Sequence, residues 1–159
     1  MISSKTSFIA LIGNPVSHSL SPIMQNAALQ YLGLDLIYIA MPCKDEDLEL
    51  VLSSLKKINC KGLNITIPHK ENVFNLCSEI SPIANKLKAI NTLKLNSEKE
   101  WSATNTDVDG FIYPLKNLNL AKKKSIVLGS GGAAKSVIQG LINLNLSKIS
   151  AIALSLIHI

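Results

Sequence analysis

Short apolar runs alternate with amphipathic segments along the chain, as in proteins that alternate β-strands with α-helices. Apolar runs predict strands at residues 8–12, 36–41, 63–67, 92–95, 126–128 and 148–152. Periodic spacing predicts helices that begin near Ser21, Asp45, Ser81 and either Asp107 or Asp109, and one over residues 133–144. Strands that alternate with helices are joined by crossovers, so we expect an α/β fold with a mostly parallel sheet.

The helix starts have recognisable signals. Ser21-Pro22 and Ser81-Pro82 each combine a preferred N-cap with a proline that the first helical position tolerates. Asp45 is the expected cap of the second helix. The apolar positions at helical spacing are Ile23, Ala27, Ala28 and Tyr31 in the first helix and Leu48, Val51, Leu52 and Leu55 in the second.

The βα pattern starts again after the lysines at 122–124, which predicts a second domain. We expect a first domain over residues 1–104, a connecting helix over 105–122 and a second domain over 123–159. No internal repeat or low-complexity segment interrupts this order.

Charge and composition exclude several classes of protein. The net charge is +5, from 16 basic and 11 acidic side chains, and only 4% of residues are aromatic. A nucleic-acid-binding surface needs a basic stripe with stacking aromatics, whereas a mild positive bias suits small anions. Cys43, Cys60 and Cys77 form no C-x-x-C pair, so we expect no disulfide framework and no metal site. Neither a signal peptide nor a membrane-spanning run is present, and we expect a cytoplasmic protein.

A glycine-rich turn follows the first strand of the second domain. Gly129-Ser130-Gly131-Gly132-Ala133-Ala134 fits G-x-G-x-x-G/A between a strand and a helix, which is typical of a dinucleotide pyrophosphate site. The segment also nearly fits a P-loop, but Ala134 stands where that pattern needs glycine. A plain strand-to-helix turn remains the third possibility.

Polar residues gather where predicted strands end, and open α/β sheets bind ligands there. Ser19 and Ser21 alternate just before a helix, so their hydroxyls could bind a carboxylate, although Ser21 could serve only as a cap. His18 beside them could be an acid/base or a structural residue.

Two further clusters carry candidate acid/base groups. Strand alternation puts Asn64 and Thr66 on one face, and Lys70 follows the strand as either a proton donor or a surface lysine. Asn91 precedes a strand, and Asp107 could either pair with Lys70 or cap a helix.

Taken together, these motifs resemble the shikimate dehydrogenase family. The resemblance runs from about Phe8 to Ile149. Six motifs carry it in the family's order: Gly13-Asn14-Pro15, Ser17–Pro22, Asn64–Lys70, Ala89–Leu93, Asn105-Thr106-Asp107 and Gly129–Lys135.

The resemblance implies a shikimate-binding catalytic N-terminal domain, followed by the start of a Rossmann-type NADP-binding domain. It implies an NADP-dependent oxidoreductase that reversibly reduces 3-dehydroshikimate to shikimate with NADPH, without a metal, in chorismate and aromatic amino-acid biosynthesis. By resemblance, Lys70 is the catalytic acid/base and Asp107 assists it. Substrate carboxylate binding falls to Ser19 and Ser21, ring-hydroxyl binding to Thr66, Lys70, Asn91 and Asp107 with support from Asn64, and pyrophosphate binding to Gly129, Ser130, Gly131, Gly132 and Ala133.

The chain also departs from the family pattern. Lys88 and Ala103 stand where the family commonly has glycine, and we expect loops to absorb both changes. There is no arginine to grip the 2′-phosphate of NADP, residues 154–159 look unlike the family, and we expect a truncated, poorly soluble or inactive form.

Two alternatives stay open besides this interpretation. They are a quinate/shikimate dehydrogenase and a non-catalytic shikimate-binding fragment. In each case we expect a small-molecule ligand, no nucleic-acid or membrane partner, and a monomer or homodimer.

Overall fold

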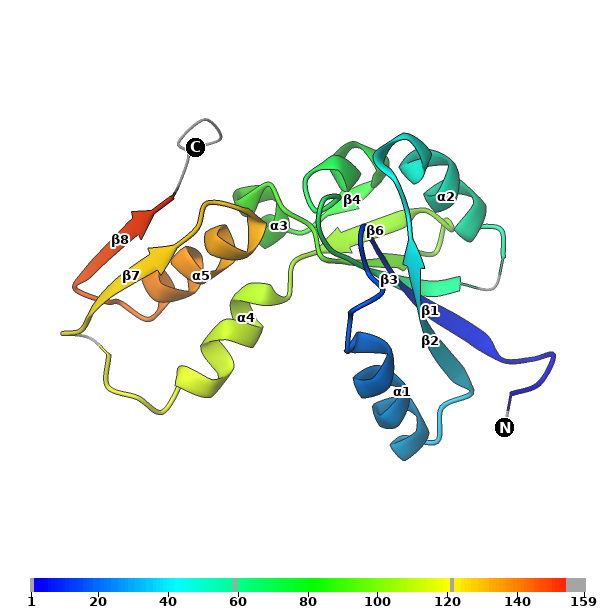
Figure 1. Cartoon of the computed structure of the whole chain (residues 1–159), viewed down its shortest axis with the longest axis horizontal. Helices are drawn as coiled ribbons and strands as arrows, with labels where there is room; N and C mark the ends of the chain where they lie inside the picture. Colours follow the sequence, from blue (N-terminus) through cyan, green and yellow to red (C-terminus); the bar gives the residue numbers. More distant parts are fainter. Residues whose placement is uncertain (1, 59, 121, 154–159) are drawn as a thin grey trace.

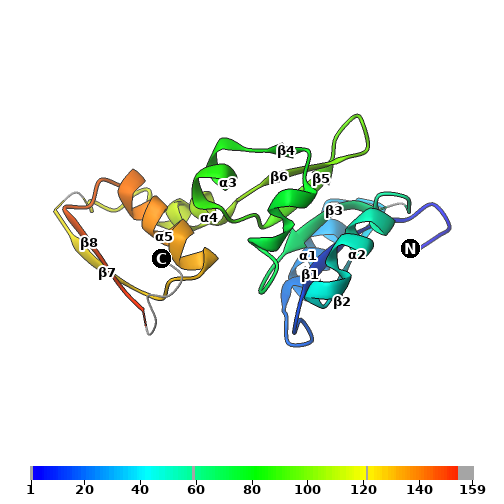
Figure 2. The ribbon, with the colours of Figure 1, turned by 90° about the horizontal axis from the view of Figure 1, so that it is seen from above.

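The computed structural model describes residues 2–58, 60–120 and 122–153, which form two lobes side by side (Figures 1 and 2). The first lobe contains β1 (Ser7–Gly13), α1 (Ser21–Tyr31), β2 (Leu36–Pro42), η1 (Asp45–Asp47), α2 (Leu48–Leu55), β3 (Cys60–Ile65), η2 (Asn72–Leu76), β4 (Glu79–Ile80), α3 (Pro82–Leu87), β5 (Thr92–Leu95) and β6 (Trp101–Thr104). The second contains α4 (Asp107–Ile112), η3 (Tyr113–Leu115), β7 (Lys124–Leu128), α5 (Gly132–Asn143) and β8 (Lys148–Ile152). The η elements are short 3₁₀ turns.

The first lobe is built on a mixed sheet in the order β2-β1-β3-β5-β6-β4. The pairs β1–β2, β1–β3 and β4–β6 are parallel, whereas β3–β5 and β5–β6 are antiparallel. The prediction of an α/β fold with a mostly parallel sheet is confirmed. The sequence prediction did not include β4 or β6, and therefore missed the antiparallel β5–β6 hairpin.

The two faces of this sheet have separate cores. On one face α2 packs its buried leucines against the central strands, and the largest buried side chain is Trp101 on β6, whose indole Nε1 donates to Leu52 O at 3.0 Å. On the other face α1 covers β1 and β2 through Leu29, which packs with Leu11 and Tyr38. The alternation of side chains along β1 supplies both cores.

The face of α1 expected from sequence to be its apolar core face points to solvent. Ile23 and Tyr31 are 72% and 88% exposed, and Leu29 is the buried residue of the helix. The expectation failed because α1 packs on β1 and β2 through Leu29, which leaves Ile23 and Tyr31 outside the contact.

The caps agree with expectation in one case out of three. Ser81 caps α3 by accepting from Ala84 N. Ser21 instead lies inside α1, and Ser19 Oγ accepts from Ser21 N at 3.2 Å. Asp45 caps no helix; its carboxylate accepts from Asn72 Nδ2 at 3.0 Å, tying the β2 loop to η2.

The second lobe has a parallel β7–β8 pair with α5 beside it, as the sequence predicts. Helix α5 packs against α4, where Gly140 lies against the ring of Phe111. This contact holds α4 against the rest of the second lobe.

Candidate functional site

One edge of the six-stranded sheet gathers the predicted site residues. The parallel strands β1 and β3 both end at this edge, and β5 starts there because Thr92 pairs with Asn64 in antiparallel register. β6 also ends there, since Thr104 pairs with Thr92. Segments far apart in the chain, at 14–21, 66–70, 91–92 and 105–107, are thus placed side by side by sheet topology.

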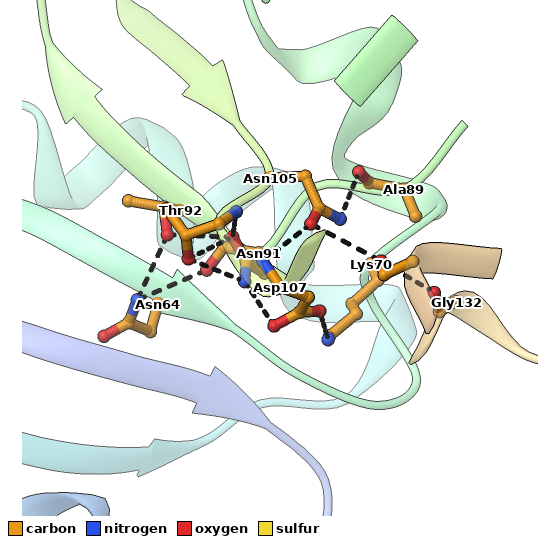
Figure 3. Close-up of polar contacts among 10 residues, drawn as sticks. Asn64, Lys70, Ala89, Asn91, Thr92, Asn105, Asp107 and Gly132 are labelled. Atoms are coloured by element: carbon orange, nitrogen blue, oxygen red, sulfur yellow. Dashed lines mark hydrogen bonds and ion pairs between the residues drawn. The ribbon is translucent and has the colours of Figure 1, made fainter. Parts of the chain in front are cut away.

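Lys70 and Asp107 form an ion pair at this edge. Lys70 Nζ lies 2.6 Å from Asp107 Oδ2, and their side chains are 16% and 33% exposed (Figure 3). Lys70 lies on the turn after β3, and Asp107 is the first residue of α4. The pairing considered from the sequence is therefore present, while its catalytic role stays a prediction.

Asn91 orients the carboxylate of this pair. Its Nδ2 donates to Asp107 Oδ1 at 2.7 Å and to Thr106 Oγ1 at 3.0 Å. Its Oδ1 accepts from Thr106 N at 3.0 Å and from Thr92 Oγ1 at 2.9 Å. Since both amide hydrogens and the oxygen are engaged, Asn91 supports Asp107 in this arrangement, and its predicted contact with a ligand would need one of these bonds to open.

Asn105, which the resemblance motif contains but to which no role was assigned, shapes the turn before α4. It is buried; its Nδ2 donates to Ala89 O at 3.0 Å, and its Oδ1 accepts from Asp107 N at 2.9 Å. The bond from Asp107 N to Asn105 Oδ1 forms an Asx-turn, which fixes the backbone of Asp107. An Asn two residues before a helix-starting Asp is the sequence signal that could have indicated it.

Asn64 belongs to the same network. Its Nδ2 donates to Asn91 O at 3.3 Å and Thr92 Oγ1 at 3.4 Å, and its Oδ1 accepts from Tyr38 Oη at 2.8 Å. Tyr38 was not among the predicted site residues. Burial raises the pKa of its hydroxyl to about 12, so at neutral pH the group is a hydrogen-bond donor.

The predicted carboxylate-binding serines line an open cavity of about 410 Å³. Ser19 and Ser21 share it with Thr66, His18 and Asn14. Thr66 connects this cavity to the ion pair, because Thr66 and Lys70 lie on the same short segment after β3. Gly13 allows the close approach of that segment, since a Cβ on Gly13 would lie 2.3 Å from Thr66 Cγ2.

His69, next to Lys70, is fully buried. Its Nε2 lies 2.8 Å from Cys43 O, and its Nδ1 lies 2.9 Å from Asp45 Oδ1 but outside hydrogen-bond alignment. Cys43 N in turn donates to Gly13 O at 3.0 Å. These contacts tie together the ends of β1, β2 and β3.

The glycine-rich turn lies between β7 and α5, as the sequence predicts. Gly129 has φ +127°, a conformation that favours glycine, and Gly131 has open space where a Cβ would be. Helix α5 begins at Gly132, so its N-terminal N–H groups face this turn. A small cavity beside it is lined by Gly129, Ser130, Ala134, Lys135, Ile138, Ala151 and Ala153.

The turn also touches the ion-pair region. A Cβ on Gly132 would lie 3.5 Å from both Lys70 Cδ and Ala89 Cβ. Lys135 Nζ of α5 contacts Glu71 Oε1, the neighbour of Lys70, at 2.6 Å. The two lobes therefore meet at the Lys70 turn.

The two departures from glycine have different structural consequences. Lys88 ends α3 in the left-handed region, with φ 53° and ψ 35°. Ala103 lies inside β6 rather than in a loop, with its side chain in the core. A loop is therefore not what accommodates Ala103. Within the described part of the chain, no cluster of three or more His, Cys, Asp or Glu side chains is arranged to hold a metal ion.

Comparison with known proteins agrees with this geometry. Residues 11–93, just over half of the chain, match the family described as shikimate dehydrogenase substrate binding domain. The chain is 93% identical over 152 residues to shikimate dehydrogenase (NADP(+)) of Prochlorococcus marinus strain MIT 9301, covering 96% of this chain and 53% of that protein. It thus spans about half the length of the curated relatives it matches.

Solved structures give the same family. The fold matches shikimate dehydrogenase from Aquifex aeolicus with a TM-score of 0.92 and 35% identity, covering 98% of this chain and 58% of that one. It matches shikimate 5-dehydrogenase from Thermus thermophilus, solved in complex with NADP(H) and shikimate, with a TM-score of 0.83 and 34% identity, covering 92% and 56%. From the family match and the geometry of the strand-end network, we conclude that the chain belongs to the shikimate dehydrogenase substrate-binding domain family.

Proposed function

We propose that this chain binds shikimate and takes part in the reversible, NADP-dependent conversion of shikimate to 3-dehydroshikimate, a step of chorismate and aromatic amino-acid biosynthesis. The observation that carries the proposal is the Lys70–Asp107 pair, 2.6 Å apart, at the sheet edge that also presents the cavity of Ser19 and Ser21. A cationic acid and a hydroxyl-lined anion site on one edge are what a polyhydroxylated carboxylic acid requires.

The residues present fit an NADP pyrophosphate. The turn at Gly129 lets the backbone approach a phosphate, and the N-terminus of α5 adds N–H donors. After Asp109 the chain contains no Asp or Glu, whereas it has six lysines there: Lys116, Lys122, Lys123, Lys124, Lys135 and Lys148. A segment with that charge favours a polyanion. When bound, NADPH would supply the hydride.

The chain's own residues would bind the ligand, orient it and donate a proton to it. Ser19 and Ser21 would hold the carboxylate of the ligand. Its ring hydroxyls would be bound by Thr66, Lys70, Asn91 and Asp107, with Asn64 as a supporting contact. Lys70 would donate a proton from Nζ to the ring oxygen on which negative charge develops, and would take it back in the reverse direction. Asp107, held by Asn91, would keep Nζ in place.

We extend the proposal to the organisation of the protein. Residues 1–104 would be the substrate-binding domain, 105–122 the connecting segment and 123–159 part of the cofactor-binding domain; the separate six-stranded and two-stranded sheets support this division. We propose a cytoplasmic monomer or homodimer whose partners are small molecules. No helix in the described residues is long and apolar enough to cross a membrane.

The test is calorimetry with shikimate on the 159-residue chain, with and without NADP. We expect binding that weakens about tenfold in Ser19→Ala and Ser21→Ala, because each loses one charge-assisted hydrogen bond of about 1–2 kcal/mol. Ser53→Ala, on the exposed side of α2, is the matched control and should bind as the wild type does. A folded wild-type chain that does not bind shikimate would overturn the proposal.

The redox part is tested separately by following NADPH formation from shikimate and NADP. Where turnover occurs, Lys70→Met should lower it by about 10²–10⁴-fold, the usual contribution of a positioned acid/base, and the exposed Lys57→Met should not. Binding of shikimate without any NADPH formation would instead support the binding-only function.

A further inference from the structure

Tyr38 lies outside the set of residues proposed to touch a ligand, yet its position is tightly fixed. Its side chain is 3% exposed and packs with Leu11, Val16 and Leu29 under α1. Its backbone is held on both sides by one amide, since Asn26 Nδ2 donates to Tyr38 O and Tyr38 N donates to Asn26 Oδ1, both at 2.8 Å. The hydroxyl therefore reaches Asn64 from a rigid base.

The hydrogen bonds of Asn64 decide what its amide can still offer. An amide side chain has two N–H donors and an oxygen that accepts twice. Both donors point inward, to Asn91 O and Thr92 Oγ1, and one acceptor position is filled by Tyr38 Oη. What Asn64 has left for a ligand is one acceptor position and no donor.

We propose that Tyr38 is a specificity-determining residue, which holds Asn64 as an acceptor so that the pocket selects a ligand hydroxyl able to donate a hydrogen bond there. This inference rests on the proposed binding of shikimate. A group of similar size that cannot donate, such as a fluorine, would face the lone pair of Asn64 Oδ1 and be rejected. Sites built to hydrogen-bond a hydroxyl discriminate strongly against analogues that lack it.

Tyr38 is the firmest of the three contacts that orient the amide. Its bond is 2.8 Å, whereas those to Asn91 O and Thr92 Oγ1 are 3.3 and 3.4 Å. Phenylalanine at position 38 would keep the packing under α1 and remove only the donor. Asn64 could then rotate and present an N–H to the ligand, so selectivity should fall more than stability.

The experiment measures how the hydroxyl of Tyr38 changes the selectivity for each ring hydroxyl of the ligand. Calorimetry would compare wild type, Tyr38→Phe and the matched control Tyr31→Phe, at a residue of α1 that is 88% exposed. The ligands are shikimate and the analogues in which each ring hydroxyl in turn is replaced by fluorine. For one analogue, we expect the loss of affinity relative to shikimate to be at least about fivefold smaller in Tyr38→Phe than in wild type and Tyr31→Phe. Losses that agree within about twofold in all three proteins, for every analogue, would overturn the inference.

A second variant tests the polarity of Asn64 without relying on Tyr38→Phe to fold. Aspartate at position 64 accepts and cannot donate, so Asn64→Asp should keep the wild-type rejection of the same fluorinated analogue. If Asn64→Asp instead removes or reverses that rejection, Asn64 meets the ligand as a donor and the inference is wrong.

A spectroscopic readout on the ligand-free chain separates this inference from the proposed function. The side-chain ¹⁵N–¹H signals of Asn64 should move in Tyr38→Phe and stay in place in Tyr31→Phe. If wild type fails to bind shikimate, the proposed function falls, and these signals alone decide whether Tyr38 orients Asn64. Unchanged Asn64 signals in Tyr38→Phe would overturn that orientation.

Discussion

Lys88 carries a local backbone strain that its neighbours partly offset. It ends α3 at φ 53°, where a side chain costs about 1 kcal/mol relative to glycine. Its Nζ donates to Asn85 Oδ1 at 2.8 Å and lies 4.8 Å from the ring centre of Phe74. The cation–π contact is worth about 0.5 kcal/mol at an exposed site, and the exposed hydrogen bond adds little. We therefore expect Lys88→Gly to stabilise the chain by about 0.5 kcal/mol, measured by urea unfolding.

The control for this prediction lies two residues earlier. Lys86 is in the last turn of the same helix with right-handed backbone, so Lys86→Gly should destabilise by about 1 kcal/mol. Equal destabilisation by Lys88→Gly and Lys86→Gly would show that the left-handed conformation at residue 88 costs nothing.

Tyr38 should make stability depend on alkaline pH. Burial raises its pKa from 10.0 to about 12 in the folded chain, so the unfolded chain loses the proton first. Below about pH 10 both states keep the proton and the contribution is constant. Between about pH 10 and 12 the unfolded state is favoured progressively, by up to about 2–3 kcal/mol for a two-unit difference.

The measurement is the free energy of unfolding of wild type and Tyr38→Phe from about pH 9 to about pH 12. We expect the difference between them to shrink as pH rises, because only wild type loses this contribution. A difference that stays constant over the whole range would contradict the assignment of a raised pKa to Tyr38.

At the scale of elements, the end of β1 sets the position of the Lys70 turn. Asn14 N donates to Ile67 O at 2.9 Å, and a Cβ on Gly13 would lie 2.9 Å from that same oxygen as well as against Thr66. Gly13→Ala must push the turn away, at a cost of about 1–3 kcal/mol, which is typical of overpacking.

We expect Gly13→Ala to lower both the urea midpoint and the affinity for shikimate, the second through displacement of Thr66. Gly110→Ala is the control, since a Cβ there meets nothing within 4 Å, and alanine in α4 should be neutral or slightly stabilising. If Gly13→Ala loses stability but binds shikimate with unchanged affinity, the end of β1 does not control the position of Thr66 in the pocket.

Most strands and helices could be predicted from the sequence because their signals are local. The run at 8–12, the Ser81-Pro82 start and the strand at 148–152 each depend on residues within one element. β4 and β6 were not predicted, because β4 has only two residues and β6 contains no apolar run. These strands are defined by their pairing with each other and, for β6, by its pairing with β5. The solvent-facing stripe of α1 was misjudged, since periodicity reports an apolar face but not what covers it.

The candidate site, like the fold, contains residues that could be predicted from the sequence and residues that could not. Lys70 and Asp107 were recognisable as residues of a familiar motif, and their pairing was one of two alternatives that the sequence left open for Asp107. The role of Tyr38 could not be predicted, because it depends on β1 lying between β2 and β3, a neighbour relation that no local pattern encodes. A contact between side chains of β2 and β3, with β1 between these strands, can be identified only from the assembled sheet.

For the whole molecule, the ion pair lies where the two lobes join. Lys70 comes from the six-stranded lobe, Asp107 starts α4, and Gly132 of α5 packs against the Lys70 side chain. Ser136 on α5 adds a long contact of 3.5 Å to Asn105 Oδ1. Placement of Lys70 is therefore sensitive to how the second lobe docks.

Docking of α4 on α5 depends on Gly140, since a Cβ at this position would lie 2.6 Å from Phe111 Cδ1. We expect Gly140→Ala to force the two helices apart and to loosen the second lobe while the six-stranded lobe stays folded. Because Lys122, Lys123 and Lys124 lie at the end of the connecting segment, limited trypsin digestion should cleave there several-fold faster in Gly140→Ala than in wild type. Gly110→Ala, on α4 but with open space around it, should be cut at the wild-type rate. Equal cleavage of Gly140→Ala and wild type would mean that the ring of Phe111 moves aside and that this contact does not hold α4 against α5.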